Sequence, residues 1–154
     1  MVFRIVAVGR PGAGPLREAI ADYEKRASRY WPIEVVEVRA EPARSRPPAE
    51  VRRLEGERLL GRAVGRIVAL DERGRSLTTE RFTQWMGERR DHAEDVSFLI
   101  GGAFGLDEAV RASAALVLSV SPWTLPHDVA RLVLAEQLYR AGTISRGEPY
   151  HKQG

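Results

Sequence analysis

The sequence has no cysteine and only three histidines among its 154 residues. Without cysteine, the chain can form no disulfide, no thiolate nucleophile and no cysteine metal site. The histidines are far apart in the sequence, so we expect no zinc site. No stretch approaches the roughly 18 consecutive apolar residues that a membrane span requires, and the N-terminus enters a strand pattern without the features of a signal peptide. We therefore expect a cytoplasmic protein without a metal.

Lysine is also scarce, with 2 lysines against 22 arginines, and the formal net charge is +3. Arginine binds phosphate bidentately and stacks on bases, so this composition suits an RNA partner. A genome whose base composition favours arginine codons would produce the same usage. The charge therefore permits nucleic acid as a partner but does not require it.

Apolar runs and helical spacing alternate along the whole chain. The pattern predicts strands at Phe3–Val8, Ile33–Val38, Ile67–Leu70, Val96–Ile100 and Leu116–Val120. It predicts helices at Leu16–Tyr30, Ala49–Ala63, from Thr78 or Thr79 to about Arg90, at Leu106–Ala114, and from about His127 to Ala141, with an irregular tail after them. Strands that are apolar on both faces and alternate with helices predict a single α/β domain over residues 1–154, with helices on both faces of a parallel sheet.

Three loops follow the carboxyl ends of strands, where such sheets bind ligands: those after Leu70, Ile100 and Val120. Glycines at 101, 102 and 105 allow the backbone to approach a ligand closely, although a tight turn without a ligand has the same composition. The loop from Ser121 to Pro126 has two prolines and a tryptophan, which suits a flat adenine ring; alternatively, the tryptophan only caps the edge of the core. The glycines after the first strand match neither the dinucleotide nor the Walker pattern, so we interpret them as structural.

Two C-terminal features remain. The last helix carries more apolar residues than a single face can hold, which indicates a subunit interface. The tail contains Tyr150 and His151, which could contact RNA or act on a proton, although a frayed terminus is the commoner case.

Together these segments resemble a known family in order and spacing. The matching segments are Val2–Gly9, Leu99–Leu106, Leu118-Ser119, Thr124–His127, Arg131–Ala141 and Pro149–Lys152. The chain resembles the bacterial 23S rRNA (pseudouridine-N3)-methyltransferases of the SPOUT class. The similarity covers essentially the whole chain and is loose only over Ala40–Val64.

This resemblance implies a fold, a cofactor and partners. The fold would be an α/β knot, in which the C-terminal segment threads through a loop to form a trefoil knot. The protein would be a homodimer joined through the knotted region, and its substrate a pseudouridine of large-subunit rRNA in the assembled ribosome. The cofactor would be S-adenosyl-L-methionine, held by Leu70, Gly101, Gly102, Val120, Ser121, Pro122, Trp123, Thr124 and Leu125.

The chemistry of such a reaction needs few groups. The methyl group of the cofactor is already activated, so positioning dominates, and the N3–H of the acceptor base must lose its proton. Our catalytic candidates are Arg140, Tyr150 and His151. Two alternatives stay open: a non-catalytic ribosome- or RNA-binding module with a vestigial pocket, and a dinucleotide-dependent enzyme, against which the missing glycine fingerprint argues.

Overall fold

The computed structural model describes residues 1–44 and 46–152, and a parallel sheet lies at its centre. The sheet has five strands in the order β2-β1-β4-β3-β5, and every neighbouring pair is parallel. The strands are β1 (Phe3–Val8), β2 (Ile33–Val38), β3 (Arg66–Ser76), β4 (Val96–Ile100) and β5 (Leu116–Ser119). The parallel α/β sheet expected from the sequence is confirmed.

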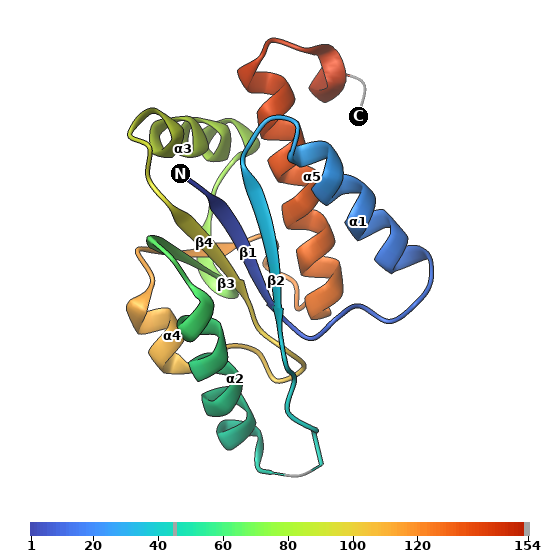
Figure 1. Cartoon of the computed structure of the whole chain (residues 1–154), viewed down its shortest axis with the longest axis vertical. Coiled ribbons are helices and arrows are strands. Elements are labelled where there is room, and N and C mark those ends of the chain that lie inside the picture. Colours follow the sequence, from blue (N-terminus) through green and yellow to red (C-terminus); the bar gives the residue numbers. More distant parts are fainter. Residues whose placement is uncertain (45, 153–154) are drawn as a thin grey trace.

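Helices cover both faces of this sheet (Figure 1), as predicted. One face packs against the first, third and fifth helices, and the other against the second and fourth. The helices are α1 (Pro15–Ala27), α2 (Pro48–Arg62), α3 (Thr79–Asp91), α4 (Glu108–Ser113) and α5 (His127–Ser145), followed by the short 3₁₀ helix η1 (Pro149–Lys152). The trefoil knot that the resemblance implies concerns the path of the chain through its loops and stays a prediction.

The core lies in two layers because the side chains of each strand alternate between the faces. In β1, Phe3 and Ile5 enter the layer under α1, α3 and α5, whereas Val6 and Val8 enter the layer under α2 and α4. All four side chains are 0–2% exposed, which is why this strand is a continuous apolar run.

Local signals position the helix starts. Pro48 is the first residue of α2, where a missing N–H costs nothing. The hydroxyl of Thr78 accepts a hydrogen bond from the backbone N–H of Arg81 at 3.1 Å and caps α3, as expected from the sequence.

The end of β3 differs from the prediction. The strand does not end at Leu70 but continues to Ser76, and its register with β5 shifts between Leu70 and Arg75. Residues 71–74 therefore form a bulge, in which Gly74 passes so close to β5 that an added Cβ would lie 2.5 Å from the carbonyl oxygen of Val117. The polar sequence of this stretch resembles a loop because the bulge turns its side chains away from the core.

The C-terminal region also differs from the prediction. The last helix continues past Ala141 to Ser145, and the tail is not irregular, because it forms η1 against α5. Gly142 does not end the helix: a Cβ there would lie 2.4 Å from the Cβ of Tyr30, so the glycine permits close packing.

Candidate functional site

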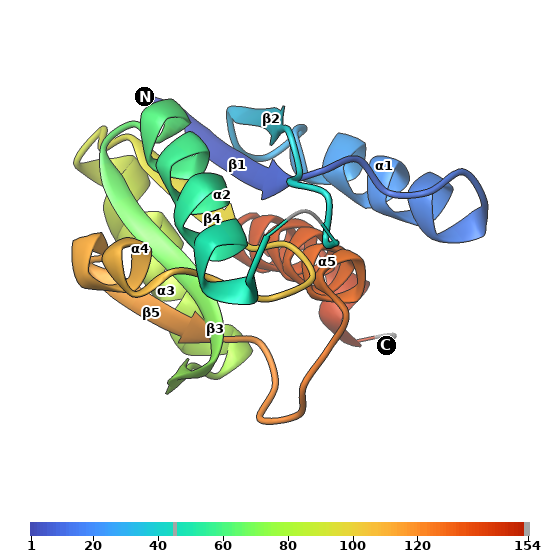
Figure 2. The same cartoon turned by 90° about the horizontal axis from the view of Figure 1, so that it is seen from below.

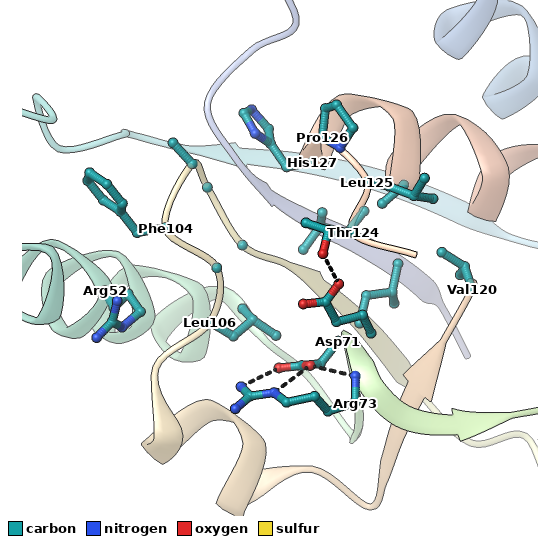
Figure 3. Close-up of a pocket in the computed structure, with 18 of the residues that line it drawn as sticks. Arg52, Asp71, Arg73, Phe104, Leu106, Val120, Thr124, Leu125, Pro126 and His127 are labelled. Carbon is teal, nitrogen blue, oxygen red and sulfur yellow. Dashed lines mark hydrogen bonds and ion pairs between the residues drawn. The ribbon is translucent and has the colours of Figure 1, made fainter. Parts of the chain in front are cut away.

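A cavity of about 1020 Å³ lies at the carboxyl edge of the sheet, near the size expected for a small-molecule site. Figure 2 looks onto this edge, and Figure 3 shows the cavity. Its walls come from the bulge of β3, the loop after β4 and the loop after β5, with the first turn of α5 at one side. These are the three loops that the sequence indicated.

Most of the predicted cofactor residues meet at this cavity. Its lining includes Leu70, Gly101, Gly102, Val120, Ser121, Trp123, Thr124 and Leu125. Pro122 is exposed and is not part of the lining, so the structure does not bring it to the cavity with the others. Contact of these residues with a cofactor stays a prediction.

The two glycines after β4 are required by the protein itself. A Cβ on Gly101 would lie 2.7 Å from the carbonyl carbon of Gly105, so the glycine lets the loop fold back on itself. A Cβ on Gly102 would lie 2.8 Å from a carboxylate oxygen of Glu55 and 3.0 Å from Val8. The tight turn considered from the sequence is therefore real, and the backbone of this turn lines the cavity.

An ionised carboxylate lies in the β3 bulge at the cavity wall. Burial alone would raise the pKa of Asp71, but hydrogen bonds from Arg73 and Arg111 outweigh it and lower this pKa to about 2. The backbone N–H of Arg73 donates at 2.9 Å and Arg111 Nη1 donates at 2.9 Å (Figure 3 shows the Arg73 contacts). This group was missed because the sequence suggested that Asp71 only ended a strand.

Hydrogen bonds of its polar side chains hold the loop after β5 in place. Thr124 donates a hydrogen bond to Glu72 of the bulge at 2.5 Å (Figure 3), and the hydroxyl of Ser121 accepts one from the backbone N–H of Trp123 at 3.0 Å. The side chain of Trp123 is 78% exposed. It therefore does not cap the edge of the core, and that interpretation of the loop is wrong.

Three further polar residues near the cavity come from elements that sequence patterns do not connect. Arg52 of α2 and His127, the first residue of α5, line the cavity, and the imidazole of His127 lies 3.3 Å from the carboxylate of Asp128. Glu55 of α2 is 3% exposed, and one of its oxygens accepts the backbone N–H of Glu41 at 3.0 Å. Burial raises the pKa of Glu55. The sequence alone does not show that α2 packs against the turn at Gly101 and Gly102.

The three catalytic candidates lie together, at the other end of α5. The guanidinium of Arg140 donates to Glu136 at 2.7 Å and lies over the ring of Tyr150, and His151 follows in η1. Burial and, to a smaller extent, a hydrogen bond with Tyr23 raise the pKa of Tyr150 to about 12. Its phenol therefore stays protonated at neutral pH. Thirteen residues of α-helix separate His127 from Arg140, which is about 20 Å at 1.5 Å per residue. These candidates therefore do not border the cavity of their own chain.

Two further structural findings bear on function. Within residues 1–44 and 46–152, no three histidine, aspartate or glutamate side chains gather as ligands for a metal ion. In the same part of the chain, no helix is both long and apolar enough to cross a membrane.

The sheet order and the loop-built cavity define an α/β protein that binds its ligand beyond the carboxyl ends of parallel strands. The family model described as "Predicted SPOUT methyltransferase" matches residues 1–151. The chain thus belongs to the SPOUT methyltransferase family, as its resemblance implied.

Relatives and solved structures agree with this family. The chain is 52% identical over 150 residues to the Ribosomal RNA large subunit methyltransferase H of Gemmatimonas aurantiaca, covering 96% of this chain and 97% of the relative. It is 47% identical over 157 residues to the protein of that name from Thermus thermophilus, covering 99% of each. A probable methyltransferase from Bordetella pertussis shares the fold, with a TM-score of 0.55, 19% identity, and coverage of 90% of this chain and 95% of that one.

Proposed function

We propose that this protein transfers a methyl group from S-adenosyl-L-methionine to N3 of a pseudouridine in the 23S rRNA of the assembled ribosome. The observation that carries the proposal is the cavity at the carboxyl edge, built by the loops that the family resemblance assigns to the cofactor. The relatives named as large-subunit ribosomal RNA methyltransferases, at 52% and 47% identity over nearly their full length, support the RNA substrate.

The lining of the cavity fits the parts of this cofactor. Leu70, Val120 and Leu125 offer apolar surface for an adenine ring, and the loops after β4 and β5 present backbone N–H and C=O groups beside it. Charged side chains at the bulge, such as Glu72, suit the charged amino-acid end. When bound, the cofactor supplies an activated methyl group on a sulfonium.

The residues of the C-terminal cluster suit the acceptor base. Tyr150 stays protonated at neutral pH, so it donates a hydrogen bond to the base or stacks on it and does not accept its proton. Arg140 keeps its positive charge and stabilises the negative charge that develops when N3 loses its proton. His151 of η1 is then the remaining candidate for accepting that proton, because a neutral imidazole has one ring nitrogen free to accept.

The separation of the cluster from the cavity supports a homodimer. Arg140, with Tyr150 against it, lies about 20 Å along α5 from the cavity of its own chain, so in this proposal a second copy supplies both residues to that cavity. Val129, Leu132 and Val133 of α5 are half-buried in the single chain and offer apolar surface for that partner. Each site would then combine the cavity of one protomer with the tail of the other.

A methyl-transfer assay tests the function. Labelled S-adenosyl-L-methionine is incubated with intact ribosomes, isolated large subunits and protein-free 23S rRNA, and the modified nucleoside is identified by mass spectrometry. We expect N3-methylpseudouridine in intact ribosomes and little in protein-free rRNA. If calorimetry detects no cofactor binding while the protein still binds ribosomes, it is a non-catalytic binding module and the proposal is wrong.

A further inference from the structure

Positive charge is concentrated in one segment of the chain, part of which borders the cavity. Between Arg39 and Arg62 the sequence has seven arginines and four glutamates, and this excess of three equals the formal net charge of +3 of the whole chain. The segment comprises the connection from β2 to α2 and the whole of α2. The rest of the chain is therefore neutral overall. The net positive charge of the protein comes from this one segment and is not spread evenly along the sequence.

Three of these arginines surround one carboxylate. Arg39 and Arg46 lie 3.7 and 3.6 Å from the carboxylate of Glu41, and Arg58 forms a hydrogen-bonded ion pair with it. Glu41 is only 10% exposed at its side chain, whereas Arg39 is 78% exposed. Glu41 therefore pairs most closely with Arg58, and Glu50 pairs with Arg46 at 3.0 Å, which leaves the exposed Arg39 as the excess positive charge of this group.

Two more arginines extend this surface to the cavity. The backbone N–H of Gly9 donates to the carbonyl of Val38 at 2.8 Å, so Arg10 leaves β1 next to the connection that begins with Arg39. Arg52 lines the cavity itself (Figure 3). Neither Arg10 nor Arg52 has an ion-pair partner within the described part of the chain. We call Arg10, Arg39, Arg46, Arg52 and Arg58 the arginine ridge.

Another part of the cavity lining has the other sign. On the side of the β3 bulge and α4, the lining contains four carboxylates and two arginines: Asp71, Glu72, Asp107, Glu108, Arg73 and Arg111. Both of these arginines are engaged by carboxylates of that wall. A polyanion is therefore attracted to the ridge and repelled from this acidic part of the lining.

We propose that the arginine ridge binds the phosphate backbone of the substrate RNA and so sets the side from which the acceptor base enters the cavity. Guanidinium groups match phosphate oxygens bidentately, and three of the five ridge arginines already lie within 3.7 Å of the Glu41 carboxylate. The inference rests on the proposed RNA substrate, but it makes a separate claim about which surface meets the RNA.

The test compares two double variants of equal charge. Arg10→Gln with Arg39→Gln removes two exposed ridge arginines, while Arg46 and Arg58 still pair with Glu41. Arg29→Gln with Arg62→Gln is the control, because both arginines are exposed and lie at the opposite edge of the sheet, Arg29 just after α1 and Arg62 as the last residue of α2. Binding to protein-free 23S rRNA and to intact ribosomes is measured from 50 to 200 mM salt, together with the affinity for S-adenosyl-L-methionine.

We expect the ridge variant to bind both RNA probes about tenfold more weakly at 100 mM salt, with a slope of log affinity against log salt reduced by about 1.5, because two phosphate contacts are lost. Its cofactor affinity stays unchanged, and the control variant behaves as wild type. An unchanged salt slope, an equal loss in the control, or a loss confined to ribosomes, which would indicate a protein contact, would each overturn the proposal. Failure of the proposed function differs from these outcomes: there, wild-type protein binds RNA through the ridge but transfers no methyl group.

Discussion

The guanidinium carbon of Arg140 lies 4.9 Å from the centre of the Tyr150 ring, which also packs against Tyr139 with ring centres 4.5 Å apart. A cation over an aromatic face and an aromatic pair each stabilise a contact by roughly 0.5–1.5 kcal/mol. The tail is therefore held on α5 before any substrate arrives. The frayed terminus considered from the sequence does not describe residues up to Lys152, which form η1.

This contact separates two roles of Tyr150. Tyr150→Phe keeps the ring between Arg140 and Tyr139 but removes the hydroxyl. If that hydroxyl donates a hydrogen bond to the acceptor base, we expect kcat on ribosomes to fall by about 10²-fold, with the melting temperature within about 2 °C of wild type. The measurement is single-turnover methyl transfer at saturating ribosome concentration.

Tyr23→Phe is the matched control for this variant. It removes the hydroxyl that interacts with that of Tyr150 while leaving the Tyr150 phenol in place. A wild-type rate in Tyr150→Phe, or an equal loss in Tyr23→Phe, would show that the hydroxyl only holds the tail.

The second prediction concerns removal of residues 149–154. Because Glu148 remains, its carboxylate still accepts the hydrogen bond from the Tyr30 hydroxyl at 2.5 Å and fixes the end of α5. We expect cofactor affinity by calorimetry and dimer mass by light scattering to stay near wild type, while methyl transfer to ribosomes falls below detection. A truncated protein that loses the cofactor or becomes monomeric would assign the tail a structural role instead.

How far the sequence predicts this fold depends on the range of the interaction. Strands β1, β2 and β4 have the predicted bounds because their apolar runs are buried on both faces and are bounded by glycine or polar residues. The end of β3 was missed because Gly74 is needed for close packing against Val117, which belongs to another strand and lies 43 positions away in the sequence. In the same way, Gly142 looks like a helix end until Tyr30 is packed against it.

The same distinction between local and long-range interactions applies to the site. The loops of the cavity were predictable because parallel sheets place the carboxyl ends of their strands at one edge. Arg52, Glu55 and the pairing of Asp71 with Arg111 were not predictable, because each joins elements far apart in the sequence. No local pattern contains such a pairing.

The third prediction concerns Gly101. Substitution by alanine places a Cβ 2.7 Å from the carbonyl carbon of Gly105, so the loop after β4 must move even without a ligand. We expect Gly101→Ala to lower both the melting temperature and the cofactor affinity, the latter by about tenfold or more, as judged by thermal unfolding and calorimetry. Gly12→Ala is the control, since a Cβ there meets no atom within 4 Å. Unchanged melting with normal affinity in Gly101→Ala would contradict the close approach within this loop.

The last prediction uses the pH dependence of Asp71. Its folded pKa of about 2 lies below the ordinary value of 3.8, because hydrogen bonds from Arg73 and Arg111 outweigh burial. A carboxylate with a lowered pKa stabilises the folded state fully above pH 4, and this stabilisation is lost as the pH falls from about 4 to about 2. A shift of this size corresponds to roughly 2 kcal/mol at pH 7.

We therefore expect Asp71→Asn to lower the free energy of unfolding in urea by roughly 2 kcal/mol at pH 7, and by much less near pH 2.5, where the wild-type carboxylate is itself becoming protonated. Asp91→Asn is the control, because that carboxylate is 70% exposed and its contact with Arg90 is 3.6 Å long, so its loss changes stability by less than about 0.5 kcal/mol at either pH. An equal loss for Asp71→Asn at both pH values would mean that the asparagine disturbs the packing of the β3 bulge. In that case the charge of Asp71 would not be what holds Arg73 and Arg111 at the wall of the cavity.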